Sequence, residues 1–293
     1  MFDRYKHHKS DLIVDSLICF VIGIFALACI LPFVYVVVAS FTPPAILAKE
    51  QFILIPKGFT MEAYKYVFST NTVVQALKVS IGITAAGTIF NIIMTVLFAY
   101  PLSHKSIRGR SVILFFVTFT MVFSGGIVPE YMLVQQLGLM NTYAALILPG
   151  AISTFNFVIF RNYFQELPRE LEESAMIDGA GYLRILVNII LPVSMPLVAT
   201  FIIMYGVGIW NSWFHATLYI SDSTKWPIQV ILRLITNISM GIGDTTMMDS
   251  NIMIPPESVR MCTIVVATMP ILMVYPFLQK YFTKGIMLGS VKG

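Results

Sequence analysis

Charge is what this sequence has least of. Only 12% of its 293 residues are charged, whereas 57% are hydrophobic. A soluble domain carries about 25% charged residues, so this composition excludes a soluble domain and indicates a polytopic membrane protein. The formal net charge of +4 is too small to indicate nucleic-acid binding, and we predict no nucleic-acid partner.

Cysteine is also scarce. The three cysteines are Cys19, Cys29 and Cys262, and all three fall inside hydrophobic runs. Cysteines placed in this way imply neither a disulfide framework nor a thiolate metal site. We therefore predict no metal site and no cofactor bound by this chain itself.

Two further absences limit what such a membrane protein can do. The interiors of the last five hydrophobic runs hold no Asp, Glu, Lys or Arg, although proton-driven carriers commonly keep ionisable groups there. The sequence also has no G-x-x-x-x-G-K-[ST] loop to hold a nucleotide. The chain cannot hydrolyse ATP by itself, and no combination of nucleophile, base and acid indicates an enzyme.

Six hydrophobic runs are long enough to cross a bilayer. They cover approximately residues 12–41, 79–102, 112–128, 143–160, 193–220 and 259–278. The first run follows a basic segment, but a signal peptide has an apolar region of only about 7–15 residues, so we predict a retained helix. The expected fold is all-α, with six transmembrane helices.

The distribution of lysine and arginine predicts the orientation. With both termini in the cytoplasm, 12 of the 19 basic residues lie on the cytoplasmic side, although the outer loops are longer in total. We predict a cytoplasmic N-terminus at residues 1–11, a transmembrane domain at 12–283 and a cytoplasmic tail at 284–293. The central loop, residues 162–192, then lies in the cytoplasm.

This central loop contains a polar stretch between Pro168 and Pro192, which no bilayer would accept. Pro168 suits a helix start, and the glutamates Glu170, Glu172 and Glu173 face the positive end of the helix dipole. Gly179 and Gly181 supply a stop. The stretch therefore predicts two short helices joined at a glycine bend.

The same stretch carries a family signature. Glu173-Ser174-Ala175, three residues, Gly179, nine residues and then Ile189-x-Leu191-Pro192 resembles the "EAA" motif of bacterial ATP-binding-cassette (ABC) importer permeases. Ser174 alone departs from that motif. The resemblance implies the type I ABC importer permease fold, with a cytoplasmic coupling helix that docks in a groove of a separate ATPase subunit. It assigns ATPase coupling to Glu172, Glu173, Ala175, Asp178, Gly179, Leu191 and Pro192.

The resemblance covers nearly the whole chain. The C-terminal segment from Pro256 is similar to the sugar-importing branch, which includes the second membrane subunit of the maltose importer. SGGIVPEYMLV and NTYAALILPG resemble permeases for complex oligosaccharides, including uronate-containing fragments of alginate, pectin or xylan. The implied partners are a homologous permease forming a heterodimer, two ATPase subunits that bind ATP and Mg, and an extracytoplasmic sugar-binding protein. The implied location is the bacterial cytoplasmic (inner) membrane.

Candidate residues for the substrate pathway combine aromatic faces with amide or hydroxyl groups, the two features that sugar sites use. They are Tyr205, Trp210, Asn211, Trp213, His215 and Asn156. An aromatic belt at the outer membrane interface explains most of this cluster equally well. Asn156 could instead bond a neighbouring helix.

Two other functions stay open at this point. An ABC permease for another solute, such as glycerol phosphate or a peptide, would share the central motif but not the sugar-branch C-terminus. A carrier working alone would require charge inside the membrane and a repeated half, and the sequence has neither.

Overall fold

The structure, a computed structural model, describes residues 9–47, 49–50, 52–240 and 257–289. Its elements in this part of the chain are helices, and no strand is found among them. The chain divides into two compact units. One comprises Met1–Thr70 and Ile235–Val266, and the other comprises Asn71–Leu234 and Ala267–Gly293. We describe each unit by itself.

The first unit contains helix α1 (Lys9–Ser40) and the short helices α2 (Pro44–Leu47) and α3 (Glu62–Ser69). Ala39, Leu47, Ile53 and Met261 form its small core. Beyond this core, α1 exposes apolar side chains along its length, such as Phe25, whose exposed fraction is 71%. A long, exposed apolar helix suits a lipid environment, and the prediction of a helix at residues 12–41 is confirmed.

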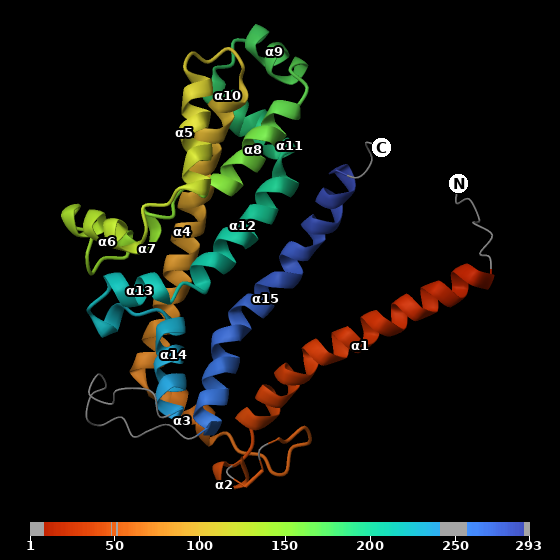
Figure 1. The fold of residues 1–293 in the computed structure, drawn as a ribbon, viewed down its shortest axis with the longest axis vertical. Coiled ribbons are helices and arrows are strands. Elements are labelled where there is room, and N and C mark those ends of the chain that lie inside the picture. The colour runs from red at the N-terminus through yellow and green to blue at the C-terminus, as the bar shows by residue number, and fades with distance from the viewer. Residues whose placement is uncertain (1–8, 48, 51, 241–256, 290–293) are drawn as a thin grey trace. The chain divides into compact units, whose positions relative to one another are not determined.

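The second unit is built around helix α4 (Asn71–Ser103), against which α8 (Thr154–Glu166) and α12 (Met195–Trp210) pack (Figure 1). Its core is aromatic, with Phe157, Phe160 and Phe164 of α8 fully buried. Gly87 permits close approach of the helices, because a Cβ there would lie 2.9 Å from Ile209 Cδ1. The predicted helix at residues 79–102 is confirmed and is longer than expected.

A sharp bend follows the next helix. Helix α5 (Arg110–Val122) and helix α6 (Ile127–Gln136) meet at an angle of 120°. Gly126, at the start of α6, has a φ of +83°, which favours glycine. The chain therefore turns sharply between the two helices at Gly125 and Gly126.

The prediction of one continuous helix at residues 143–160 was wrong. The structure has a single turn, α7 (Ala144–Ile147), separated from α8 by a non-helical segment that contains Pro149 and Gly150. Proline lacks the amide hydrogen that a continuing helix needs, and glycine disfavours helix. The predicted span at 193–220 is likewise divided, into α12 and α13 (Phe214–Tyr219).

The polar stretch between Pro168 and Pro192 forms the predicted pair of helices. Helix α9 (Glu170–Ile177) ends at a bend, and α10 (Tyr182–Ile185) continues through a π-helical turn, η1 (Leu186–Ile190), into α11 (Leu191–Val193). The second helix does not stop at Pro192 as expected. Instead the chain bends by 85° at Ser194, where α12 begins.

The C-terminal region differs from the expectation at one point. No helix was predicted between the hydrophobic runs at 193–220 and 259–278, but the structure has a 3₁₀ turn, η2 (Ser223–Lys225), and a helix, α14 (Ile228–Ser239), in this segment. Residues 241–256 lie outside the described residues. Helix α15 (Glu257–Gly289) confirms the predicted helix at 259–278 and extends past it.

Three described helices are long and apolar enough to cross a membrane: those at 14–40, 71–103 and 257–276. Counting each of the two bent pairs, α5 with α6 and α10–α11 with α12, as one span raises this number to five. The fold is therefore an all-helical membrane fold. The number of crossings enters the proposed function below.

Candidate functional site

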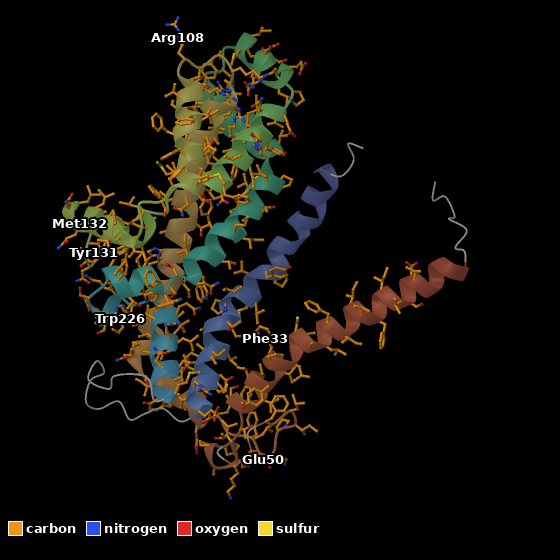
Figure 2. All side chains as sticks on the ribbon, viewed as in Figure 1. Phe33, Glu50, Arg108, Tyr131, Met132 and Trp226 are labelled. Atoms are coloured by element: carbon orange, nitrogen blue, oxygen red, sulfur yellow. The ribbon has the colours of Figure 1, made fainter. Side chains whose placement is uncertain are left out.

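Helix α9 occupies one end of the second unit, beside the turn that joins α4 to α5 (Figure 1). Its first turn carries Glu170, Glu172 and Glu173, where carboxylates stabilise the positive end of the helix. Figure 2 shows Arg108 projecting from the α4–α5 turn at this same end. Both elements are polar segments between apolar helices.

Glu172 is buried, with only 4% of its surface exposed, and fixes α9 to the end of α4. Its Oε2 atom lies 2.7 Å from Nε2 of His104 and 3.3 Å from a guanidinium nitrogen of Arg169. Arg169 in turn donates to the backbone carbonyl of Ser103 at 3.2 Å. A buried carboxylate needs such partners, and here they join α9 to the residues that end α4.

Both ring nitrogens of His104 face oxygen atoms. Its Nδ1 lies 3.0 Å from the carbonyl oxygen of Tyr100, and its Nε2 lies 2.7 Å from Oε2 of Glu172. The imidazole ring therefore connects the last turn of α4 to α9.

The other predicted coupling residues divide between the inner and outer faces of α9. Ala175 is buried in the core of the unit, whereas Glu173 and Asp178 are exposed. The most exposed apolar side chain of this face is Ile177, with an exposed fraction of 87%. Leu171, Met176, Tyr182 and Leu183 of the same hairpin are also exposed, and a group of exposed apolar side chains is typical of a surface that another protein covers.

Gly179 makes the bend after α9. Its φ is +78°, a conformation that side chains other than glycine rarely adopt, while a Cβ at this position would meet no atom within 4 Å. Its amide donates to the Met176 carbonyl at 3.0 Å, which closes the end of the helix. Leu191 packs against the core and Pro192 is exposed, both within α11.

A polar cavity of about 580 Å³ lies elsewhere in the second unit, between α4, α8, α12, α13 and the α6–α7 region. Three of the predicted pathway residues, Asn156, Tyr205 and His215, line it. Asn156 is buried, and the His215 ring stacks on Tyr219 at 5.9 Å between centroids. The structure thus brings together residues from α8, α12 and α13.

Tyr205 connects the walls of this cavity. Its hydroxyl lies 2.7 Å from Oγ1 of Thr95 on α4 and accepts a hydrogen bond from the amide of Ser153 at 3.2 Å. Ser153 directly precedes α8. The tyrosine therefore positions three segments around the cavity, because each bond fixes one of them relative to α12.

The other three predicted pathway residues do not line this cavity. Trp210 lines a second, almost entirely apolar cavity of about 670 Å³, and its indole donates to the Ala267 carbonyl at 3.1 Å. Asn211 is exposed at the end of α12. The guanidinium carbon of Arg233 lies 3.7 Å from the centre of a Trp213 ring, a cation–π contact.

Sequence reasoning missed several residues of the polar cavity. They are Asn91, Glu130, Ser153, Ser212 and Tyr219. Glu130 could have been found from the sequence, because it is an acidic residue between two hydrophobic segments, just after the glycines that precede α6. Asn91 and Tyr219 are separated from it by dozens of residues, so their proximity to Glu130 follows only from the tertiary fold.

A set of hydrogen bonds fixes the segments around Glu130. Asn141, with a φ of +60°, donates its amide to the Tyr219 carbonyl at 2.8 Å and accepts from the Asp222 amide at 3.1 Å. Asp222 accepts from the hydroxyl and amide of Thr224, and these bonds lower its pKa from the ordinary value. The α6–α7 turn is thereby joined to the end of α13.

No group of three His, Cys, Asp or Glu side chains that could hold a metal ion occurs within the described ranges. The described residues thus offer an exposed face on α9 and a polar cavity.

Comparison with known proteins agrees with these features. The family described as "Binding-protein-dependent transport system inner membrane component" matches residues 78–288. The chain is 51% identical over 267 residues to Protein LplC of Bacillus subtilis, covering 90% of each chain. It is 48% identical over 280 residues to the polygalacturonan/rhamnogalacturonan transport system permease protein YtcP of Bacillus subtilis, covering 95% of this chain and 98% of that one.

A solved structure is similar along nearly the whole chain. It is a chain of a bacterial ABC transporter involved in the import of the acidic polysaccharide alginate, with a TM-score of 0.85 and 29% identity. The likeness covers 95% of this chain and 99% of that one. With a family match that includes α9 and the polar cavity, this chain belongs to the inner membrane components of binding-protein-dependent transport systems.

Proposed function

We propose that this chain is the permease subunit of an ATP-driven importer for oligosaccharides derived from polysaccharides such as alginate, pectin or xylan. The observation that carries the proposal is the α9 hairpin, anchored through buried Glu172 to the end of α4 while its outer face exposes Ile177 and Glu173. A rigidly anchored surface transmits movement from a partner to the helix that holds it. The names of the relatives support the sugar substrate.

The partner of this surface is an ATPase subunit. The chain has no phosphate-binding loop of the Walker type, so the energy of ATP must arrive from a separate protein. Nucleotide-driven closure of that protein would push on α9, and the network of Glu172, His104 and Arg169 would pass the movement to α4. ATP and Mg would bind to the ATPase subunits, with no cofactor on this chain.

The complete importer would contain four kinds of protein. Besides two ATPase subunits, a homologous permease would form a heterodimer with this chain, and an extracytoplasmic binding protein would deliver the sugar. The family description, which names dependence on a binding protein, supports that last partner. The exposed apolar helices of the chain offer surfaces for the sister permease and for lipid.

The proposed topology has six crossings of the bacterial cytoplasmic membrane, with both termini in the cytoplasm. The lysine and arginine distribution supports this orientation. Residues 1–11 and 284–293 would be cytoplasmic, and the coupling loop at 162–192 would lie on the same side. The polar cavity lined by Asn156, Tyr205 and His215 would form part of the sugar pathway within the domain at 12–283.

Co-purification tests the proposal. The chain, extracted from its native membrane in mild detergent, should bring with it a sister permease and an ATPase subunit. ATP hydrolysis by this assembly should rise when an oligosaccharide-loaded binding protein is added. A chain that purifies alone and transports sugar alone would contradict the proposal and favour a secondary carrier.

A further inference from the structure

The polar cavity has an unusual charge balance for a protein whose relatives handle acidic polysaccharides. One carboxylate, that of Glu130, lines it, and neither lysine nor arginine is among the described residues of its lining. The remaining polar groups are amides, hydroxyls and the His215 ring. A lining with a carboxylate and no cationic side chain favours an uncharged sugar over an acidic one.

Glu130 is held in place on two sides. It lies in the first turn of α6, whose N-terminus favours a negative charge, and its Oε1 accepts a hydrogen bond from the Tyr219 hydroxyl at 3.1 Å. Tyr219 is itself fully buried and packs with Val134 and Ala145. The carboxylate is therefore fixed in position, and Oε2 has no hydrogen-bond partner among the described residues.

The α4 and α8 walls of the cavity each contribute an asparagine. Asn91 is 3% exposed; its Nδ2 donates to the Gly150 carbonyl at 3.3 Å, and its Oδ1 is buried with no hydrogen-bond partner among the described residues. Asn156 is 5% exposed and also lines the cavity. A few polar groups of this kind fix the orientation of a ligand in a cavity.

We propose that this cavity is a subsite for an uncharged, hydroxyl-rich sugar unit and that Glu130 excludes uronate units from it. Sugar hydroxyls donate to the Glu130 carboxylate, and they accept from the Asn156 amide. A uronate carboxylate in the same place would face a fixed negative charge with no cation in the described lining. The inference rests on the proposed function, because it assigns one sugar unit of the transported oligosaccharide. It narrows the proposed substrates to oligosaccharides that contain an uncharged unit, which fragments of alginate lack.

The test compares two α-1,4-linked trisaccharides, galactotriose and trigalacturonate, which differ at C6, where the first has hydroxymethyl groups and the second has carboxylates. Their binding to the purified complete assembly, without the binding protein, is measured by ligand-observed NMR. Wild type should bind galactotriose at least about 10-fold more tightly than trigalacturonate. Glu130→Gln keeps the shape and the acceptor for Tyr219, and it should reduce this preference to about twofold or less.

Two further variants make the result specific. Glu62→Gln removes an exposed carboxylate outside the cavity and should leave the preference unchanged. Asn156→Leu replaces the amide by an apolar group of similar size and should weaken galactotriose binding several-fold. Binding is measured only for variants whose complete assembly can be purified.

Several results would overturn the inference. They are equal binding of the two sugars to wild type, tighter binding of trigalacturonate, no binding of either sugar, or an unchanged preference in Glu130→Gln. The ATPase content of the same preparation and its stimulation by loaded binding protein test the proposed function separately. If loaded binding protein stimulates ATP hydrolysis but wild type shows no preference between the two sugars, only the subsite proposal is wrong. If no ATPase subunit is present in the assembly, both the subsite proposal and the proposed function are wrong.

Discussion

Two neighbouring glutamates at the start of α9 have opposite environments. Glu172 is 4% exposed and lies within hydrogen-bond distance of His104 and Arg169, whereas Glu173 is exposed. Removing one partner of a buried charge network leaves the others without compensation, whereas an exposed carboxylate is solvated by water. Glu172 therefore anchors α9 to the end of α4, whereas Glu173 is free to contact a partner protein.

This difference predicts effects of very different size on stability. Glu172→Ala should lower the free energy of unfolding by about 3–5 kcal/mol, because His104 and Arg169 lose their buried partner. Glu173→Ala should change it by less than about 0.5 kcal/mol. Thermal unfolding of the detergent-purified assembly measures both. Equal effects of the two substitutions would show that Glu172 does not anchor the hairpin.

At the scale of the element, the α9 hairpin depends on one backbone conformation. Gly179 has a φ of +78°, whereas Gly181, two residues later, has a φ of −76°, which any residue adopts. A Cβ at either position would meet no atom within 4 Å. The two glycines therefore differ only in the backbone strain that a side chain would cause.

The pair gives a matched experiment on the bend. Gly179→Val should cost about 1–2 kcal/mol in local backbone strain, which would displace the hairpin and lower sugar-stimulated uptake while membrane insertion is kept. Gly181→Val should leave uptake near the wild-type level. The measurement is uptake into proteoliposomes with membrane content as the control. Uptake by Gly179→Val equal to that of Gly181→Val would show that the left-handed bend is not required.

The hairpin could be predicted from sequence because its signals are local. Pro168, the three glutamates and Gly179 act within one or two turns of the positions they define. The buried contact from Glu172 to His104 could not be predicted, because the two residues are 68 positions apart. The break at Pro149 and the helix α14 were missed because hydrophobicity alone marks a span without showing where a helix ends.

The residues that line the polar cavity could likewise be predicted only in part. Asn156, Tyr205 and His215 were selected by residue type and do line it, but Trp210 and Trp213 were selected by the same criterion and do not. Which face of α12 points into the cavity depends on its packing against α4 and α8. Composition identifies candidates for such a site, and tertiary packing selects among them.

At the scale of the whole molecule, the proposed orientation places the α4–α5 turn and the α9 hairpin in the cytoplasm and the α13–α14 turn outside. Ser106 and Ser223 are exposed residues on these two opposite sides. Basic residues remain preferentially on the cytoplasmic side. The two serines therefore report the orientation directly.

Cysteine labelling tests this orientation. The reagent is a membrane-impermeant maleimide, and the cells are treated so that it reaches the outer face of the intact cytoplasmic membrane. Ser223→Cys should then react, whereas Ser106→Cys should react only after the cytoplasmic membrane is permeabilised. The natural cysteines Cys19, Cys29 and Cys262 are first replaced, so that labelling reports a single site. Labelling of Ser106→Cys in intact cells would contradict the cytoplasmic position of the hairpin end.

The central claim is that the outer face of α9 docks on an ATPase subunit, and photo-crosslinking at Ile177 tests it most directly. A photoreactive phenylalanine analogue replaces Ile177, whose exposed fraction is 87%, or, as a control, the exposed Met132 on α6. The account predicts a covalent adduct between the Ile177 position and the ATPase subunit, and no such adduct from the Met132 position. Absence of the Ile177 adduct from an assembly that contains the ATPase, or equal adducts from both positions, would contradict the docking role of α9.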